Sequence, residues 1–284
     1  MHWAEAGRLE HMFPSTTVEA GVERLSATRV VFLLAMGVAW PAGEVAAQDW
    51  CHESRRAVAC EVREYSFASD GDLEIDGGMN GGIHVTGWDG DEVRVEARVR
   101  AQAPEQGRAE EILNGIEIYA SARSVEADGP DMGRREGWSV SYRVFVPHAT
   151  DLELETHNGG ISLEDVSGRI RMSALNGGVK IAGAGGDVVG RTTNGGLSVE
   201  LSGDRWAGEG LDLRTTNGGV TVAIPEGYSA EFETATVNGG FALDVPMTLQ
   251  GRLGRRLRST LGDGGAPVRV TTTNGGVKIR RAGR

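Results

Sequence analysis

Histidine, acidic and arginine side chains are the groups in this chain that could do acid–base or binding chemistry. None of the histidines recurs at a fixed interval, and none lies at a spacing from serine and aspartate that is typical of nucleophilic catalysis. The carboxylates Glu153, Glu155 and Glu164 fall within one short stretch, and a carboxylate pair is what glycoside hydrolysis requires. We expect them to be solvated surface charges, and we predict no catalytic residues. Four histidines lie beyond residue 47: His52, His84, His148 and His157.

Short aspartate runs could in principle hold calcium. Asp70-Gly-Asp72 and Asp89-Gly-Asp91-Glu92 offer oxygen ligands, and Gly185-Gly-Asp187 resembles part of a calcium-binding nonapeptide repeat. The aspartate does not recur at that period, however. The two cysteines also lack histidine or cysteine partners at zinc-binding spacing. We therefore predict no metal site and no cofactor.

The densest basic patch lies in a long insertion, residues 246–267, and guanidinium groups there could bind an anionic glycan or the carboxylates of a partner. The net charge of −11 argues against nucleic acid as the main partner. We expect an envelope protein or a glycan instead. The predicted contact residues are Arg252, Arg255, Arg256 and Arg258, together with Lys180, Arg191, Arg214 and Thr221.

A repeated unit must position these side chains. In its last six copies an apolar residue stands six residues before an Asn-Gly-Gly, and two more stand three and five residues after the Asn. Thr stands two residues before the Asn in all but one of these copies, where the residue is Ala174. A strand–corner–strand unit in tandem predicts stacked β-structure. The seven corner residues are Asn80, Asn158, Asn176, Asn194, Asn217, Asn238 and Asn274.

Two all-β architectures fit this unit. In a β-solenoid each unit is one coil, like residues stack in columns, and the Asn side chains form a hydrogen-bonded ladder beside a Thr ladder. In an antiparallel meander or sandwich, each Asn-Gly is a hairpin turn. We favour the solenoid, because a hairpin makes no demand on the second Gly or on Thr. We expect positive φ at the corner, and a second Gly that leaves room where neighbouring backbones pass closely.

The N-terminal segment has the pattern of a secretory signal peptide. Residues 30–40 are continuously apolar, Arg24 and Arg29 precede them, and Val45-Ala46-Ala47 follows as a cleavage pattern. We predict a leader at 1–47, a cysteine-bearing cap at 48–72 and a β-repeat domain at 73–284. Within that domain, residues 73–147 form the opening strands and residues 148–284 form the array.

The opening section has a pattern of its own. Cys51 and Cys60, an even pair in an exported chain, predict one disulfide. Alternation predicts a strand over 93–99, and further strands are expected over 116–122 and 138–146, with a helix over 105–113. We expect these elements to cover one end of the array and Arg280, Arg281 and Arg284 to charge the other.

The repeats also resemble a known family. The run VFVPHATDLELETHNGGISLEDVSGRIRMSALNGGVKI at 144–181, the later T-x-N-G-G units and the final VRVTTTNGGVKIRR are similar to the bacterial DUF4097 adhesin-like family. The resemblance covers residues 65–282, because LEIDGGMNGGIHVTGWDGDEVRVEARV is similar to that family's start.

The resemblance implies an exported, glycine-rich, β-helix-like domain that binds surfaces and carries no catalytic residues. It also implies an alternative, since related domains in some bacteria act in envelope-stress signalling. We expect a non-enzymatic protein in the periplasm, at the cell surface or outside the cell. A regulatory envelope module is the alternative, and a carbohydrate-active enzyme is a third reading.

Overall fold

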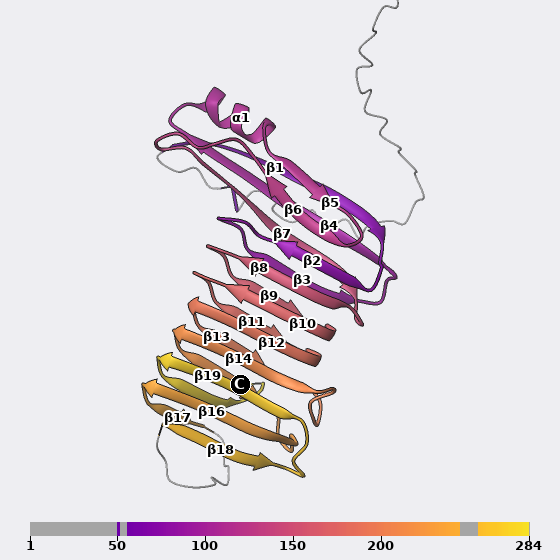
Figure 1. Ribbon diagram of the computed structural model, residues 1–284, viewed down its shortest axis with the longest axis vertical. Helices are drawn as coiled ribbons and strands as arrows, with labels where there is room; N and C mark the ends of the chain where they lie inside the picture. Colours follow the sequence, from indigo (N-terminus) through magenta and orange to yellow (C-terminus); the bar gives the residue numbers. More distant parts are fainter. Residues whose placement is uncertain (1–49, 52–55, 245–254, 284) are drawn as a thin grey trace, which may run out of the picture. The chain divides into compact units, whose positions relative to one another are not determined.

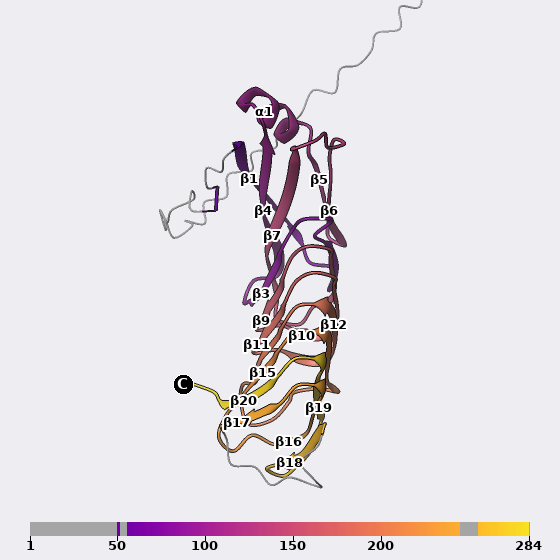
Figure 2. The ribbon, with the colours of Figure 1, turned by 90° about the vertical axis from the view of Figure 1, so that its left-hand side faces the viewer.

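Two ten-stranded sheets face each other across an apolar core in the computed structural model of the chain (Figures 1 and 2). The structure describes residues 50–51, 56–244 and 255–283, which belong to one unit spanning residues 46–284. The predicted leader at 1–47, His52 and Arg252 lie outside the described residues. The all-β prediction and the solenoid are both confirmed.

Each sheet has one strand of every coil, and α1 (Gln106–Asn114) packs against β1 and β4. Sheet A contains, in spatial order, β1 (Ala57–Ala68), β4 (Glu92–Ala103), β7 (Gly137–Pro147), β3 (Ile83–Trp88), β9 (Ile161–Glu164), β11 (Val179–Ala182), β13 (Leu197–Glu200), β15 (Val220–Ile224), β20 (Val277–Arg281) and β17 (Phe241–Leu243). Sheet B contains β18 (Arg256–Leu261), β16 (Ala230–Asn238), β19 (Pro267–Asn274), β14 (Gly210–Asn217), β12 (Gly185–Asn194), β10 (Ser167–Ala174), β8 (Asp151–Thr156), β2 (Asp72–Asp76), β6 (Ser124–Asp128) and β5 (Glu117–Ala120).

The alternation of each unit places its apolar side chains between the sheets. In β8, Leu152 and Leu154 are buried while Glu153 and Glu155 are exposed, as a period of two requires. In each coil an Asn-Gly-Gly corner joins a strand of sheet B to a strand of sheet A, and the coils stack in parallel. The apolar column six residues before each Asn is in register throughout: Leu152, Ile170, Val188, Leu211, Val268 and Phe232.

The coils do not stack in sequence order at the C-terminal end. The coil of Asn274, formed by β19 and β20, lies between the coil of Asn217 and the coil of Asn238. The expectation that Arg280 and Arg281 charge an open end is therefore wrong, because β20 pairs with β15 on one side and β17 on the other. That end carries the three-residue strand β17 in sheet A and the antiparallel strand β18 in sheet B. A short edge and an edge with outward arginines both discourage further strand pairing.

The opening section is antiparallel in sheet A. The strands β1, β4 and β7 pair antiparallel, and β7 then pairs parallel with β3, where the coils begin. The predicted helix and the strands at 93–99 and 138–146 are confirmed by α1, β4 and β7. Sequence reasoning missed β1, which lies in the predicted lead-in. It also missed β6.

The predicted disulfide joins Cys51 to Cys60, with the two Cα atoms 6.1 Å apart. Cys60 is on β1, the edge strand of sheet A, so the bond fixes the start of the described chain to that edge. Trp50 lies beside Arg98 of β4, whose guanidinium carbon is 5.9 Å from the ring centroid. These contacts attach residues 50–51 to the opening strands.

Candidate functional site

The Asn corner forms a continuous hydrogen-bonded ladder. Each Asn Nδ2 donates to the Oδ1 of the next Asn along the stack, in the spatial order 238, 274, 217, 194, 176, 158 and 80, over distances of 2.6–3.1 Å. Asn80, whose flanks differ from those of the other six, is the last acceptor of this ladder. Because the side-chain amides bond one another, they stabilise the stack, and we do not treat the corner as a binding site.

The glycines of the corner are needed for close packing between coils. None of them has positive φ, so the expectation of a left-handed corner is wrong. The close approach falls on the first Gly and not on the second. A Cβ on Gly177 would overlap the carbonyl oxygen of Gly159, and a Cβ on Gly195 would overlap that of Gly177. At the second position, a Cβ on Gly178 would lie 3.1 Å from the carbonyl oxygen of Gly196.

The Thr column satisfies the carbonyls of those first glycines. Thr192 Oγ1 donates to the carbonyl oxygen of Gly177 at 2.6 Å, and Thr215 Oγ1 donates to that of Gly195 at 2.7 Å. Thr156, Thr236 and Thr272 make the same bond to the neighbouring coil. The hydroxyls therefore bond backbone between coils and do not form a ladder among themselves.

The predicted contact residues fall on two different faces. Arg191, Arg214, Arg256 and Arg258 point outward from sheet B, whereas Lys180 and Thr221 point outward from sheet A. Arg255 lies in the bend before β18, where its carbonyl accepts a hydrogen bond from the backbone N–H of Thr236. The structure thus brings the arginines of the 246–267 insertion together with Arg191 and Arg214 of the repeat strands, and it separates them from Lys180.

A shallow hollow on the outer face of sheet B, which we call the arginine hollow, gathers the basic side chains. Its volume is about 770 Å³. Small side chains such as Ser173, Ala235 and Thr271 form part of its floor. One acidic residue, Glu233, lies among its lining residues. The lining arginines are Arg191, Arg214, Arg256, Arg258 and Arg269.

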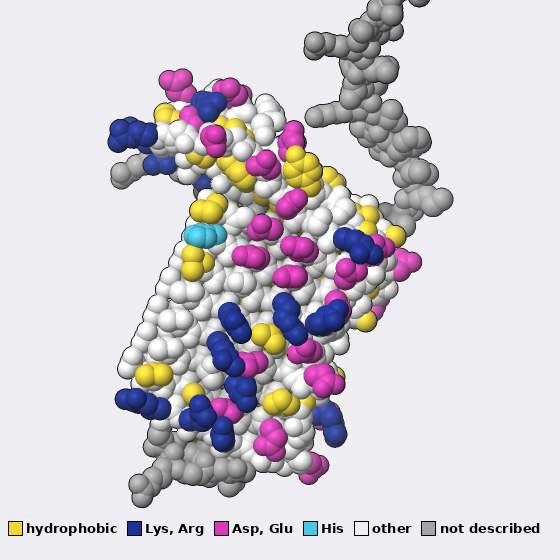
Figure 3. All heavy atoms as spheres, in the orientation of Figure 1, with side chains coloured by type: hydrophobic (Ala, Val, Ile, Leu, Met, Phe, Trp, Pro, Cys, Tyr) yellow, Lys and Arg dark blue, Asp and Glu magenta, His cyan; other side chains and the backbone are white. Residues whose placement is uncertain are grey.

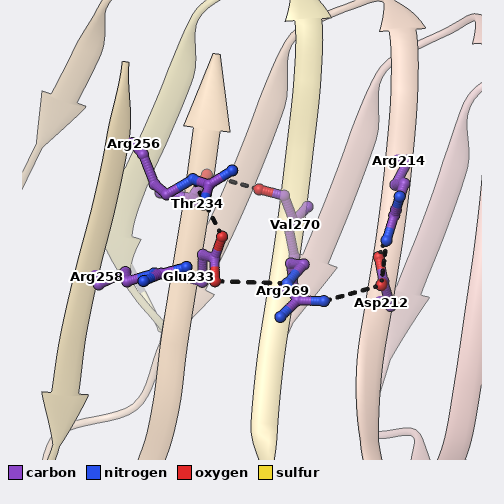
Figure 4. A network of polar contacts seen from close by, with 8 residues as sticks. All are labelled: Asp212, Arg214, Glu233, Thr234, Arg256, Arg258, Arg269 and Val270. Atoms are coloured by element: carbon purple, nitrogen blue, oxygen red, sulfur yellow. Dashed lines mark hydrogen bonds and ion pairs between the residues drawn. The ribbon is translucent and has the colours of Figure 1, made fainter. Parts of the chain in front are cut away.

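Two carboxylates hold part of this cluster in place (Figure 4). Glu233 lies 3.4 Å from Arg256, 3.2 Å from Arg258 and 3.6 Å from Arg269. Asp212 accepts two hydrogen bonds from Arg214, of 3.0 and 2.8 Å, and one of 3.4 Å from Arg269. The hydrogen bonds from Arg214 lower the pKa of Asp212, so this carboxylate stays charged.

Arg191 differs from the other arginines of the hollow. Its side chain is exposed and makes no hydrogen bond or ion pair with any residue in the part of the chain that the structure describes. A planar guanidinium with unused N–H groups is well suited to bind a carboxylate, sulfate or phosphate. Arg191 is therefore the arginine of the hollow with the most free donors toward solvent.

A second concavity runs along the outer face of sheet A. It has a volume of about 880 Å³ and follows the column of second glycines, including Gly82, Gly160 and Gly178. Lys180 lines it but is bonded to Glu164 at 3.1 Å. His84 also lines it, and burial lowers the pKa of this histidine. The side chain of His84 is therefore neutral at pH 7. Arg98 and Arg143 also line the groove, and both pair with Glu96, at 2.7 and 3.5 Å.

His148 is the described histidine whose ring contacts both a carbonyl oxygen and a carboxylate. His148 Nδ1 lies 2.7 Å from the carbonyl oxygen of Asp165, and its Nε2 lies 3.3 Å from Asp89. The hydrogen bond to that carbonyl, and then Asp89, raise its pKa. Within residues 50–51, 56–244 and 255–283, no three His, Cys, Asp or Glu side chains group as metal ligands would. The only helix in those ranges, α1, is too short to cross a membrane.

Sequence reasoning missed Asp212, Glu233 and Arg269 as partners of the arginines. It also missed a signal in the aligned repeats. The residue three positions before the Asn reads Glu155, Ser173, Arg191, Arg214, Ala235 and Thr271. Because the coils stack in register, this variable position forms a row of side chains across sheet B. A search for variation within the repeat would have located the hollow.

Comparison with known proteins gives a family and a set of distant folds. The family model described as Toastrack DUF4097 matches residues 68–280. No curated protein matches the chain significantly. Among solved structures, a putative cell adhesion protein from Clostridium sporogenes ATCC 15579 is similar, with a TM-score of 0.41, 11% identity and coverage of 78% of this chain and 100% of that chain. A putative adhesin from Bacteroides fragilis NCTC 9343 has a TM-score of 0.35 and 12% identity, with coverage of 78% and 97%. A putative lipid binding protein from Parabacteroides distasonis ATCC 8503 has a TM-score of 0.31 and 9% identity, also with coverage of 78% and 97%.

Proposed function

Because the chain belongs to the DUF4097 Toastrack family, we propose that it is a non-enzymatic, exported protein that binds anionic polymers through the arginine hollow. The observation that carries this proposal is the charge balance of the hollow, where five arginines and one acidic residue line a single concave face. Glu233 and Asp212 neutralise part of this charge, and the remaining positive charge favours an anion that approaches from outside. A glycan bearing carboxylates or sulfates supplies such anions at regular intervals along one chain.

The stacked coils hold the arginines of the hollow at fixed intervals, so that one polymer chain can contact several of them. Neighbouring strands lie about 4.8 Å apart, so the arginines of β12, β14, β19 and β18 stand on one rigid sheet at fixed intervals. An exposed ion pair contributes about 0.2–1 kcal/mol, which is weak for one contact. Several such contacts along one polymer combine, because each bound group raises the effective concentration of the next.

A binding assay with two probes tests this proposal. We expect the chain to bind sulfated dextran and not neutral dextran of the same length, with affinity that falls as salt is added. The variant Arg191→Glu/Arg214→Glu should bind at least tenfold more weakly. Arg134→Glu/Arg205→Glu makes the same change in net charge at exposed sites outside the hollow, and it should bind nearly as the wild type. Equal loss in both variants would refute the hollow as the site.

Export is the second part of the proposal. The disulfide between Cys51 and Cys60 supports it, since such bonds persist in oxidising compartments. We propose that residues 1–47 are removed and that a cap at 48–72 precedes the repeat domain. N-terminal sequencing of the exported chain should then begin at Gln48. The envelope-stress function implied by the family stays a separate prediction. Neighbouring genes for a sensor kinase or an anti-sigma factor would support it.

A further inference from the structure

Three threonines border the arginine hollow on the side of the Asn ladder. Thr193, Thr216 and Thr273 each precede an Asn of the ladder and lie on β12, β14 and β19, or directly beside Asn at their ends, and these are consecutive strands of sheet B. All three residues line the hollow, and we call them the threonine strip. Figure 3 shows this face of the molecule, with Lys and Arg side chains gathered over the C-terminal coils and uncharged surface beside them.

The strip is continuous in space but interrupted in the sequence. Because the coil of Asn274 lies beside the coil of Asn217, Thr273 is next to Thr216, and the coil of Val237 lies beyond it. Threonine is common on strands for its shape alone. That preference does not explain why threonine occurs at this position only in the coils whose arginines line the hollow. In chain order, the residue before the Asn reads Met79, His157, Leu175, Thr193, Thr216, Val237 and Thr273.

The hydroxyls of the strip are not used by the fold. In each of these coils the preceding threonine, which is Thr192, Thr215 or Thr272, points inward and bonds the backbone of the neighbouring coil. The strip residues point outward and are half-buried or exposed, and their hydroxyls make no hydrogen bond with any residue in the described ranges. These hydroxyls are therefore available to a ligand.

The strip supplies hydrogen-bond acceptors, which the arginines lack. A guanidinium group only donates hydrogen bonds, whereas a hydroxyl both donates and accepts. The carboxylates of Asp212 and Glu233 are paired with arginines. The side chains of Asn194 and Asn217 each donate and accept within the ladder. A ligand that carries hydroxyl groups as well as anionic groups would find acceptors in the strip.

We propose that the threonine strip is a specificity determinant, which selects a polysaccharide with free hydroxyl groups over other polyanions in the arginine hollow. The polysaccharide chain runs across the strands. Its anionic groups contact Arg191 and Arg214, and its sugar hydroxyls bond the strip. The inference deepens the proposed function and rests on it, because the same hollow holds the ligand.

The arginines and the strip form two parallel rows that one extended chain can contact. Arg191 and Arg214 face each other on β12 and β14, and each lies two residues before its strip threonine, so both rows point outward on the same face. Two residues advance about 7 Å along a strand, and neighbouring strands lie about 4.8 Å apart. A sugar residue that lies between the rows, with substituents on both sides of its ring, can therefore contact both.

Two sulfated polymers separate the recognition of charge from the recognition of hydroxyls. Partially sulfated dextran carries sulfate esters and free sugar hydroxyls, whereas poly(vinyl sulfate) carries sulfate esters without sugar hydroxyls. On the full chain, Thr193→Val/Thr216→Val/Thr273→Val removes the three hydroxyls and keeps the branched shape of the side chains. We expect this variant to bind sulfated dextran about fivefold or more weakly than the wild type, since up to three hydrogen bonds are lost. It should bind poly(vinyl sulfate) as the wild type does.

Two further variants control for side-chain shape and for the number of hydroxyls removed. The corresponding triple substitution of the strip to Ser keeps the hydroxyls and should bind both polymers nearly as the wild type does. Ser162→Ala/Ser198→Ala/Thr221→Val removes three outward hydroxyls from sheet A, and it should also bind both polymers nearly as the wild type does. Denaturant unfolding of each variant establishes that it is folded.

Three results would overturn the inference: a Val variant that binds both polymers as the wild type does, a Val variant that loses both to the same extent, or a Ser variant that loses sulfated dextran as the Val variant does. In each case, binding of the wild type to sulfated dextran would leave the proposed function standing. Arg191→Glu/Arg214→Glu should weaken binding of both polymers, which distinguishes the arginines from the strip. If the wild type bound no sulfated dextran, the proposed function would fail, and this inference would fail with it.

Discussion

The opening section, residues 56–150, and the coil array, residues 151–281, achieve a buried core in different ways. In the opening section long strands pair antiparallel, such as β1 and β4 with 12 residues each. The residues that face each other on these strands are of different types. In the array the strands are mostly shorter and parallel, and most residues lie beside their own equivalents in the next coil. The array therefore constrains residue identity, as does the Asn80 corner in the opening section, whereas the antiparallel strands constrain mainly polarity.

This difference shows where to look for function. The stack itself uses the positions that are identical from coil to coil. The Asn and Thr side chains bond neighbouring coils, and the first Gly leaves the space that close packing needs. Positions that vary from coil to coil are not needed for stacking. Arg191, Arg214 and Arg269 of the arginine hollow occupy such positions, so binding is expected there and not at the repeated Asn, Thr and Gly positions.

The largest expected effect is on the free energy of unfolding, which Gly→Ala should lower in the array and raise in the opening section. Gly195→Ala should destabilise the array by about 3 kcal/mol, since the new Cβ would overlap the carbonyl oxygen of Gly177 and the coils would have to separate. Gly107→Ala in α1, where a Cβ meets nothing within 4 Å, should stabilise the chain by about 0.5 kcal/mol through helix propensity. Denaturant unfolding of both variants measures the two effects.

The control for that comparison is Gly240→Ala, in the second corner position of the outermost coil. A Cβ there also meets nothing within 4 Å, so the midpoint of unfolding should hardly change. If Gly195→Ala were as harmless as Gly240→Ala, close coil-to-coil packing would not be the reason for the repeated glycine.

Removal of a ladder amide should cost less. Asn194 donates to Asn176 and accepts from Asn217, so Asn194→Ala breaks two hydrogen bonds at an exposed corner and should cost about 1–2 kcal/mol. Asn238 only donates, to Asn274, and Asn238→Ala should cost about half as much. Thermal and denaturant unfolding would reveal the difference.

The opening section supplies the control for the ladder. Asn114 is an exposed residue at the end of α1, and Asn114→Ala should leave stability unchanged within about 0.5 kcal/mol. Equal effects at residues 114, 194 and 238 would argue that the ladder adds nothing to stability.

The single exception in the Thr column is a position where a substitution should increase stability. Ala174 lies in register with Thr156 and Thr192, and Thr there could donate to the carbonyl oxygen of Gly159 as its neighbours do. Ala174→Thr should raise the free energy of unfolding by about 0.5–1.5 kcal/mol, and Thr192→Ala should lower it by a similar amount. If Ala174→Thr destabilised the chain, the extra methyl group would not fit at this coil.

The sequence was sufficient for the coil and its register because the period repeats. A column such as Ile161, Val179 and Leu197 needs no structure to be recognised, and the helix near Gln106 follows from ordinary local signals. The position of the Asn274 coil could not be predicted. Its residues satisfy the same columns as those of Asn238, so nothing local distinguishes which of the two lies next to Asn217.

The site was only half predictable for the same reason. Arg256 and Arg258 were visible as a cluster, but their neighbours were not. Glu233 lies beside them because β18 pairs with β16, and Arg269 lies near because the Asn274 coil is inserted next to β16. The close approach at the first Gly could not be assigned either, because both glycines repeat equally well. Only the distance to the neighbouring carbonyl distinguishes them.

The smallest expected effect concerns two histidines near the junction of the two regions. Burial lowers the pKa of His84 on β3, and the hydrogen bond to Asp165 raises that of His148, which follows β7. Between its lowered folded pKa and about 6.5, His84 binds more protons when unfolded, so its contribution to stability is lost as pH falls. His148 binds more protons when folded between about 6.5 and its raised pKa, so its contribution is lost as pH rises.

The two histidines should therefore oppose each other across neutral pH. His84→Gln should make stability less sensitive to falling pH, and His148→Gln should make it less sensitive to rising pH, as measured by denaturant unfolding from pH 5 to pH 8 at about one-unit intervals. NMR titration of the ring protons gives the direct check, with a pKa below about 6.5 for His84 and above it for His148. A reversed order would mean that the side chain of His84 is hydrated in the groove of sheet A and that His148 does not hold its bond to Asp165 in solution.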